Sequence, residues 1–193
     1  MSRGYAATSI DSVAELIQAT KGLIYYYFKS KSDLYLAIHL QAMDMSLNSV
    51  VPVVNGPGTP SERLRQMINI HAHLLMDNFA MHKVSLEGVS AHLSGSTTPT
   101  QRQVLADLIK MRDTYESLYK NILQEGIETG EFRKLDPKIG AKLLLGMVNW
   151  MTIWFRPEGG SGTRGIDQIA SEAADFAMSG VRNTGASMDT AMG

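Results

Sequence analysis

The sequence predicts an all-α fold, with a small front module of two short helices followed by a bundle of about six further helices. Two observations lead to this prediction. Apolar residues recur with the helical period along most of the chain, and no segment shows the alternation that is typical of a strand. Short polar residues that cap helix N-termini stand before the periodic segments, and clusters of proline and glycine separate them.

The composition is that of a folded globular protein. The chain has 193 residues, of which 44% are hydrophobic and 19% charged, and its formal net charge is −1, so any basic surface must be local. There is no cysteine, which excludes disulfides, thiolate metal sites and cysteine nucleophiles and fits a cytoplasmic protein. The first residues lack the apolar region of a signal peptide, and the most apolar run, residues 143–155, is too short to span a bilayer.

The front module is expected to contain two short helices. The first covers about Ser9 to Ile17, a tight turn follows, and the second covers about Lys21 to Phe28. Ser30 with Asp33 is expected to cap a longer helix over residues 31–50. The following stretch "VVPVVNGPGTP" holds three prolines and two glycines, and we expect it to end that helix.

The remainder of the chain predicts a helical bundle. Ser61 is expected to cap the next helix, Gly130 to stop the longest one, and Asp136 to cap another with Pro137 as its first residue. The expected helices cover about residues 61–78, 81–93, 101–129, 137–155 and 166–182. The small-residue tail, 186–193, is expected to fray.

The two front helices have the layout of a helix-turn-helix, whose second helix can lie in the major groove of DNA. Thr20 is a plausible cap for that helix, and Gly22 would permit a close approach of backbone to a sugar-phosphate chain. The free N–H groups at the helix start attract phosphate.

The aromatic run "IYYYF" cannot be buried as a whole. Successive residues on a helix point about 100° apart, so Tyr25, Tyr26 and Tyr27 cannot all face one core. Ile24 and Phe28, four residues apart, share a face and are the expected core pair. At least one or two of the tyrosines must therefore face outward, beside an acid-free patch that contains Lys21, Lys29 and Lys31. Hydroxyl and ammonium groups of this kind bind phosphate oxygens.

A family resemblance strengthens this interpretation. The segment "GYAATSIDSVAELIQATKGLIYYYFKSKSDLYLAI", from Gly4 to Ile38, strongly resembles the DNA-binding motif of the TetR family of bacterial repressors. The order T-K-G-x-x-Y-Y-x-F-x-S-K-x-x-L makes the likeness specific. The resemblance implies a homodimer that binds double-stranded operator DNA through its first helices and is released by a small-molecule effector. The C-terminal domain of such a protein holds the effector pocket and the dimer face.

The resemblance implies roles for individual residues. Ser9 and Lys31 would bind backbone phosphate, Tyr25 and Tyr26 would meet bases or phosphates, and Tyr27 would line the groove side. The DNA-binding set is therefore Ser9, Lys21, Gly22, Leu23, Tyr25, Tyr26, Tyr27 and Lys31. The implied organisation is a helix-turn-helix domain over 1–38, a helical effector-binding and dimerisation domain over 39–185, and a flexible tail over 186–193.

The chain departs from the family pattern at two places. The family has a further helix before the residues that correspond to "RGY", and only Met1 to Arg3 precede Gly4 here, so we expect either that the true start lies upstream or that this chain lacks that helix. The turn usually carries glycine where this chain has Gln18, which implies some left-handed backbone strain. A second hypothesis follows from the first departure: a helical ligand-binding or dimerisation protein that does not bind DNA.

The effector pocket is predicted from the second half of the chain. The segment "MVNWMTIWFRPEGG" is similar to the stretch before the last helix in TetR-type regulators of fatty-acid and steroid breakdown, which sense acyl-CoA thioesters. Apolar side chains with a few polar ones form the usual lining of a ligand pocket, and methionines suit it. The pocket is expected to be lined by His71, Leu75, Phe79, Met111, Tyr115, Leu118, Tyr119, Met147, Trp150, Met151 and Trp154. A core or a dimer seam is the alternative for these residues.

Neither metal binding nor catalysis is predicted. His71 and His73 lie two residues apart and so point to different faces of a helix, which makes them a poor metal pair. Together with His82 and His92, they are expected at the surface or with a single hydrogen bond. No Ser-His-Asp triad or carboxylate pair stands out. We therefore expect no cofactor, no metal and no enzymatic activity.

Overall fold

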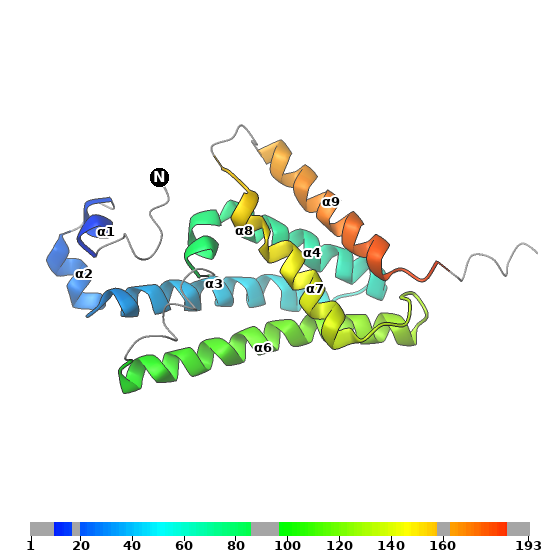
Figure 1. The fold of residues 1–193 in the computed structure, drawn as a ribbon, viewed down its shortest axis with the longest axis horizontal. Coiled ribbons are helices and arrows are strands. Elements are labelled where there is room, and N and C mark those ends of the chain that lie inside the picture. Colours follow the sequence, from blue (N-terminus) through cyan, green and yellow to red (C-terminus); the bar gives the residue numbers. More distant parts are fainter. Residues whose placement is uncertain (1–9, 17–19, 86–96, 158–162, 185–193) are drawn as a thin grey trace, which may run out of the picture. The chain divides into compact units, whose positions relative to one another are not determined.

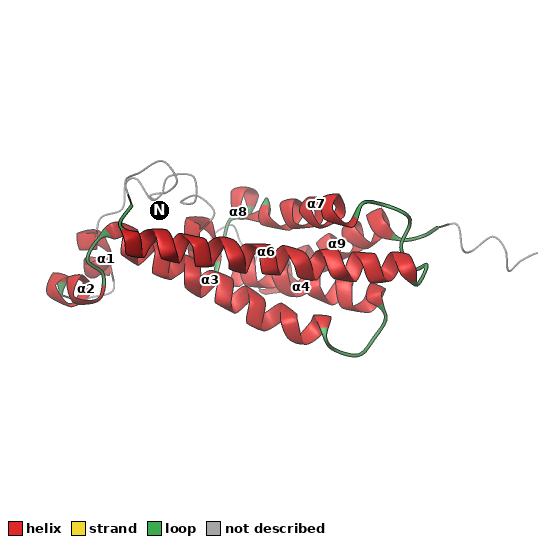
Figure 2. Cartoon of the chain, turned by 90° about the horizontal axis from the view of Figure 1, so that it is seen from below, coloured by secondary structure: helices red, strands yellow, loops and turns green. Residues whose placement is uncertain are grey.

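The computed structural model describes residues 10–16, 20–85, 97–157 and 163–184. In these ranges the chain is helical and contains no strand, which confirms the predicted all-α class (Figure 2). One isolated antiparallel bridge joins Phe132 to Arg182. No helix in the described part of the chain has the length and apolar character needed to cross a bilayer.

The chain forms two compact units. Unit 1 contains Met1–Met45 and Asn78–Arg112, and unit 2 contains Ser46–Asp77 and Asp113–Gly193. Each unit thus joins two stretches that lie far apart in the sequence. The functional boundary expected after residue 38 stays a prediction.

Unit 1 begins with two short helices, α1 (Ile10–Leu16) and α2 (Lys21–Tyr27) (Figure 1). Thr20 caps α2 as predicted, because its Oγ1 accepts a hydrogen bond of 3.2 Å from the Leu23 N–H. Ile24 is buried with Ile10 and Ala14, and Phe28 packs against this cluster. The predicted core pair of α2 is confirmed.

Helix α3 (Lys31–Val54) starts where the sequence predicts and ends later. Ser30 caps it, with its Oγ accepting from the Asp33 N–H at 3.1 Å. The predicted end at Val50 is wrong, because the helix continues through Pro52. Pro52 has no N–H to donate to the carbonyl four residues before it, so the helix continues without that bond, and the fully buried Val50 lies one turn from its end.

Helix α4 (Pro60–Asp77) is capped by Thr59, and the predicted cap Ser61 is wrong. The Thr59 Oγ1 accepts from the Glu62 N–H at 3.3 Å, and a Glu62 carboxylate oxygen accepts from the Thr59 N–H at 2.8 Å. This reciprocal pair is a capping box. The Ser61 N–H instead donates to the Glu131 carboxylate at 3.0 Å, which ties the start of α4 to the loop after α6.

Residues 79–85 are helical, and the rest of the helix expected over 81–93 lies outside the described residues. Helix α6 (Pro99–Glu128) begins two residues before its predicted start. Thr98 and Gln101 form its capping box, with bonds of 3.2 Å and 3.1 Å between backbone N–H and side-chain oxygen. Gly130 ends the helical stretch with a φ of 79°, as expected of a glycine stop.

Unit 2 is completed by α7 (Pro137–Asn149), α8 (Met151–Trp154) and α9 (Thr163–Val181). Asp136 caps α7 as predicted, accepting from the Lys138 N–H at 2.8 Å. The expected single helix over 137–155 is interrupted at Trp150, and the Thr152 hydroxyl donates to the Asn149 carbonyl beside this break at 2.8 Å. Helices α4 and α9 lie side by side (Figure 1). The expected tail, 186–193, lies outside the described residues.

Candidate nucleic-acid interface and ligand pocket

Helix α2 presents a large aromatic surface to solvent. Its exposed fractions are 50% for Leu23, 46% for Tyr25, 72% for Tyr26 and 68% for Tyr27. The rings of Tyr26 and Tyr27 meet edge to face, with centroids 5.1 Å apart. A seven-residue helix with Ile24 in the core has no second buried face for three consecutive tyrosines. The prediction that tyrosines face outward is confirmed for all three.

Lys21 and Lys29 of the acid-free patch have partners within unit 1. The Lys21 ammonium lies 2.6 Å from the Asp11 carboxylate, and its hydrogen bond to this group raises the pKa of Lys21. Both side chains are exposed, so the pair is screened by water and adds little stability. Lys29 donates to the carbonyls of Tyr25 (3.3 Å) and Tyr26 (3.2 Å), which satisfies the free C-terminus of α2. Asp11 therefore reduces the positive charge available at Lys21.

The other predicted DNA contacts surround α2. A Cβ built on Gly22 would meet no atom within 4 Å, so the backbone there is open to a ligand. Lys31, the first residue of α3, is half-buried. Ser9 lies outside the described residues. The structure thus brings six of the eight predicted residues onto α2 and one to the start of α3, and their contacts with DNA stay a prediction.

Sequence reasoning missed a hydrogen-bonded link between α3 and α6. The Gln101 side-chain amide donates to the Asp33 carboxylate at 2.8 Å and to the Ser30 hydroxyl at 3.3 Å. These bonds lower the pKa of Asp33, with the Gln101 bond as the largest cause. The capping pattern Thr98-x-x-Gln101 was visible in the sequence, but nothing in it indicated that the same amide reaches another helix.

In unit 2, three of the predicted pocket residues form a buried polar cluster. The Tyr119 hydroxyl lies 3.3 Å from His71 Nδ1 and 3.4 Å from the Met67 carbonyl, to which it donates. The ring centroids of His71 and Tyr115 are 5.3 Å apart. Burial raises the pKa of both tyrosines, and the Tyr115 hydroxyl has no hydrogen-bond partner in the described part of the chain. An unpaired buried hydroxyl is costly and can be satisfied by a ligand or a water.

The remaining predicted pocket residues differ in burial. Leu75 and Met151 are buried, whereas Trp150 and Trp154 are 62% and 47% exposed. The half-buried members are Phe79, Met111, Leu118 and Met147, of which Phe79 lies under the Lys83 ammonium at 5.6 Å.

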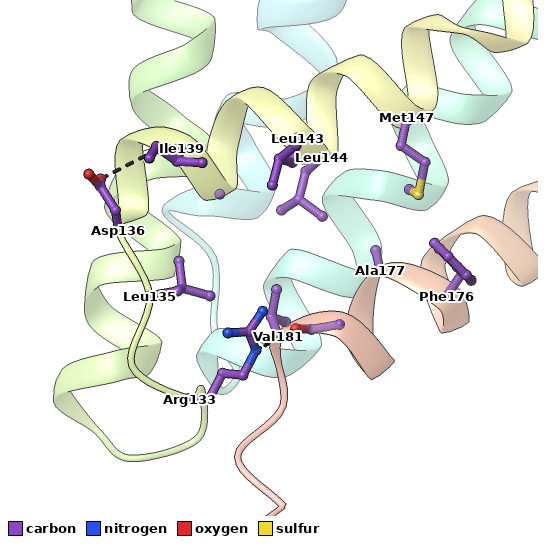
Figure 3. Close-up of a pocket in the computed structure, with 12 residues that line it drawn as sticks. Arg133, Leu135, Asp136, Ile139, Leu143, Leu144, Met147, Phe176, Ala177 and Val181 are labelled. Atoms are coloured by element: carbon purple, nitrogen blue, oxygen red, sulfur yellow. Dashed lines mark hydrogen bonds between the residues drawn. The ribbon is translucent and has the colours of Figure 1, made fainter.

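A cavity of about 420 Å³ lies between α7 and α9 in unit 2. Figure 3 shows Leu143, Leu144 and Met147 of α7 facing Ala177 and Val181 of α9 across it. Met147 is the one predicted pocket residue among those that line it. The cavity opens beside large apolar side chains that are exposed, namely Ile139 at 58%, Leu143 at 68% and Phe176 at 73%. The sequence did not single out these three, and for Leu143 the reason is that a run as apolar as "KLLLGMV" hides which side of the helix is unpartnered.

A second apolar hollow, of about 490 Å³, lies in unit 1 and is lined by Phe28, Leu34, Ala37, Ile38, Gln41, Ala80, Met81 and Val84. Among the described residues, no three His, Cys, Asp or Glu side chains are grouped to hold a metal ion. His73 instead pairs with Asp77 at 3.8 Å and Asp167 at 3.5 Å. His82 is buried, against the expectation of a surface or singly bonded histidine, and its Nε2 has no hydrogen-bond partner in the described part; burial lowers its pKa to about 4.

Comparison with known proteins gives matches along nearly the whole chain. Residues 1–38 match the model of bacterial regulatory proteins of the tetR family, and residues 57–181 match that of the tetracyclin repressor-like C-terminal domain. A fatty acid metabolism regulator protein of Bacillus subtilis (strain 168) is 25% identical over 154 residues, which cover 78% of this chain and 75% of the relative.

Two solved structures are similar in both fold and sequence. The TetR family transcriptional regulator PfmR from Thermus thermophilus is 27% identical, with a TM-score of 0.77 over 91% of this chain and 90% of that chain. AibR, solved in complex with isovaleryl coenzyme A and operator DNA, is 26% identical, with a TM-score of 0.71 over 90% of this chain and 89% of that chain. Because a family model matches more than half of its residues, the chain belongs to the TetR family of transcriptional regulators.

Proposed function

We propose that the protein is a transcriptional repressor that binds a palindromic operator as a homodimer through α2 and is released by a small apolar or acyl-CoA-like effector. The observation that carries the proposal is the outward aromatic face of α2. Leu23, Tyr25, Tyr26 and Tyr27 expose large apolar area on a helix whose core position, Ile24, is already filled. Exposed aromatic patches of this kind are typical of interaction sites.

Each predicted contact has a physical rationale. The tyrosine hydroxyls and the lysine ammonium groups bind phosphate oxygens, which fix the position of α2 on the duplex. Gly22 leaves room for the sugar-phosphate backbone at the start of α2. The Leu23 and Tyr25 side chains make apolar contacts in the major groove. Ser9, Lys21 and Lys31 complete the proposed phosphate contacts.

Dimerisation would cover the exposed side chains of α7 and α9. Ile139 and Leu143 on α7 and Phe176 on α9 form an apolar face beside the 420 Å³ cavity. The same face on a second copy of the chain could pack against it about a two-fold axis. Such a dimer would present two α2 helices to the two halves of a palindrome. Trp150 and Trp154 follow α7 closely in the sequence and are also exposed, so they could belong to the same dimer interface.

The effector class follows from the relatives and from the buried cluster. AibR was solved with isovaleryl coenzyme A, and the Bacillus subtilis relative is a fatty acid metabolism regulator. The Tyr115 hydroxyl, buried and unpaired in the described part, is a donor that the carbonyl of a thioester would satisfy. Leu75, buried one helical turn after His71 on α4, would suit the acyl chain.

Release would follow if the effector binds more tightly to a conformation in which α3 is shifted. The two recognition helices would then no longer match successive major grooves. The shift in equilibrium is limited by the difference in effector affinity between the two conformations.

The DNA-binding proposal can be tested with a labelled duplex that carries an inverted repeat from the DNA flanking the gene. Anisotropy titrations at several salt concentrations should give an affinity that falls as salt rises. Lys31→Ala should weaken binding to every duplex and flatten the slope of log K against log salt by about one unit. Lys134→Ala removes an exposed lysine of unit 2 and serves as the control. If Lys31→Ala changed only the preference for one duplex sequence over another, the proposed phosphate contact of Lys31 would be contradicted.

The effector proposal can be tested on the same complex. Acyl-CoA thioesters of increasing chain length should release the duplex, and free coenzyme A should not. Tyr115→Phe should reduce the effect of the thioesters while leaving DNA affinity without effector unchanged. A chain that dimerises and binds thioesters but no duplex would favour the alternative of a ligand-binding protein without DNA-binding activity.

A further inference from the structure

Helix α6 is bonded directly to the cap of α3. The Gln101 side chain is buried, with 8% of its surface exposed, and its hydrogen-bonding groups are engaged. Its Oε1 accepts from the Thr98 N–H at 3.1 Å, and its Nε2 donates to Asp33 at 2.8 Å and Ser30 at 3.3 Å. One amide therefore joins the first turn of α6 to the first turn of α3.

The position of this link gives it a functional meaning. Ser30 is the residue that caps α3, and Lys31, the proposed phosphate contact, comes next in the chain. Helix α2 ends at Tyr27, so only two residues separate it from the same cap. A displacement of the cap would therefore move both Lys31 and the C-terminal end of α2.

Apolar packing supports the same pair of helices. Tyr35 and Leu36 of α3 are buried with Leu108 of α6, and Val104 and Leu105 pack against them. This cluster holds the two helices together along their sides but leaves the orientation of the first turn of α3 to shorter-range contacts. The charge-assisted bond from Gln101 to Asp33 is directional and so specifies that orientation.

We propose that Gln101 is a positioning residue for DNA binding, an inference that rests on the proposed DNA-binding function. Gln101 holds the cap of α3, and with it Lys31 and α2, in the orientation that fits the duplex. Helix α6 is continuous from Pro99 to Glu128 and also carries Tyr115 and Tyr119. A movement of α6 that breaks the Gln101 bonds would therefore lower DNA affinity without any change in α2 itself.

Gln101→Glu separates this link from the other role of the residue. A glutamate keeps the size of the side chain and the acceptor that caps α6, because capping boxes use glutamate as well as glutamine. It loses the amide donor and places a carboxylate against Asp33. The matched control is Gln103→Glu, on the same helix, where the exposed Gln103 amide donates at 3.2 Å to Asp107 of α6 itself.

The experiment compares the duplex affinity of the wild-type full chain with that of each variant. Circular dichroism and thermal unfolding check that each variant is folded. Gln101→Glu should lower affinity about tenfold, as expected for the loss of one charge-assisted hydrogen bond, and Gln103→Glu should leave it unchanged. The pair Gln101→Glu with Asp33→Asn restores a donor opposite an acceptor and should recover most of the affinity. If Gln101→Glu does not fold, Asp33→Asn alone should show a smaller loss in the same direction.

The two proposals fail in different ways. Equal affinity of the wild type, Gln101→Glu and Gln103→Glu, each folded and each binding with the expected salt dependence, would overturn the role of Gln101 and leave the DNA-binding function standing. Failure of the paired variant to recover affinity would overturn the role of Gln101 as well. Failure of the wild type to bind any duplex would overturn the DNA-binding function, and the role of Gln101 with it.

Discussion

Tyrosines occur in two contrasting environments in this chain. Tyr25, Tyr26 and Tyr27 lie on α2 with about half to three quarters of their surfaces exposed, whereas Tyr115 and Tyr119 on α6 are 5% and 0% exposed. The spacing explains the difference, because three consecutive residues on a helix point in three directions and residues four apart share one face. The same type of side chain thus forms an exposed surface in unit 1 and a buried polar cluster in unit 2.

The largest expected effect is on stability, and it should separate the two groups. Tyr119→Ala removes a fully buried ring and should lower the free energy of unfolding by about 3–5 kcal/mol, the cost typical of such a cavity. Tyr26→Ala should change it by less than about 0.5 kcal/mol, since that ring is 72% exposed. Denaturant unfolding measures both. Similar losses for the two variants would contradict the contrast in burial.

Alkaline pH should also separate them. Burial holds the pKa of Tyr115 and Tyr119 above the ordinary value of 10.0, so above pH 10 the unfolded chain loses these protons before the folded one does. Stability should therefore be unaffected by these groups below pH 10 and should fall above it, by about 1.4 kcal/mol per pH unit for each tyrosine. Tyr115→Phe should remove the contribution of one tyrosine from this slope. Unfolding curves between pH 9 and 11 check this.

A smaller effect distinguishes the two buried hydroxyls from each other. Tyr119→Phe removes the bonds to His71 and the Met67 carbonyl and should cost about 1 kcal/mol. Tyr115→Phe removes a hydroxyl with no partner in the described part, so it should be neutral or slightly stabilising. Destabilisation of equal size in both variants would indicate that the Tyr115 hydroxyl is satisfied, for example by an ordered water.

The smallest stability effects are expected on α2, where a substitution should change DNA binding without changing the free energy of unfolding. Tyr26→Phe and Tyr27→Phe should leave unfolding unchanged and still weaken duplex binding, because they remove hydroxyls that belong to the proposed DNA-binding surface. Lys29→Ala is a useful comparison, because it changes the end of α2 and leaves the tyrosines in place. It removes the donors to the Tyr25 and Tyr26 carbonyls and should affect binding only through fraying of α2. Circular dichroism and duplex titration on the same samples test this separation.

Local signals in the sequence were sufficient for much of the fold. Thr20, Ser30 and Asp136 act as caps where short polar side chains precede an apolar pattern, and Gly130 ends a helix at positive φ. The misplaced cap at α4 has a clear reason: both Thr59 and Ser61 are good caps, and the partner Glu62, three residues after Thr59, decides between them.

What escaped prediction depends on contacts between distant residues. Pro52 remains inside α3, and Trp150 divides a run that is helical by periodicity. Sequence reasoning put His71, Tyr115 and Tyr119 in one group, and these side chains lie together, but their role in a pocket stays a prediction. It put Trp150 and Trp154 in the same group, and both are exposed. The Gln101 link could not be foreseen, because 68 residues separate it from Asp33.

The most direct test of the DNA-binding role of α2 is selection from a pool of random duplexes by the full chain. The account predicts enrichment of an inverted repeat with half-sites about one helical turn, or a multiple of it, apart, and binding that weakens as salt rises. It also predicts that a chain with Tyr26→Ala and Tyr27→Ala, folded as stably as the wild type, enriches nothing. Enrichment of the same repeat by that variant, or no enrichment by the wild type, would contradict the account.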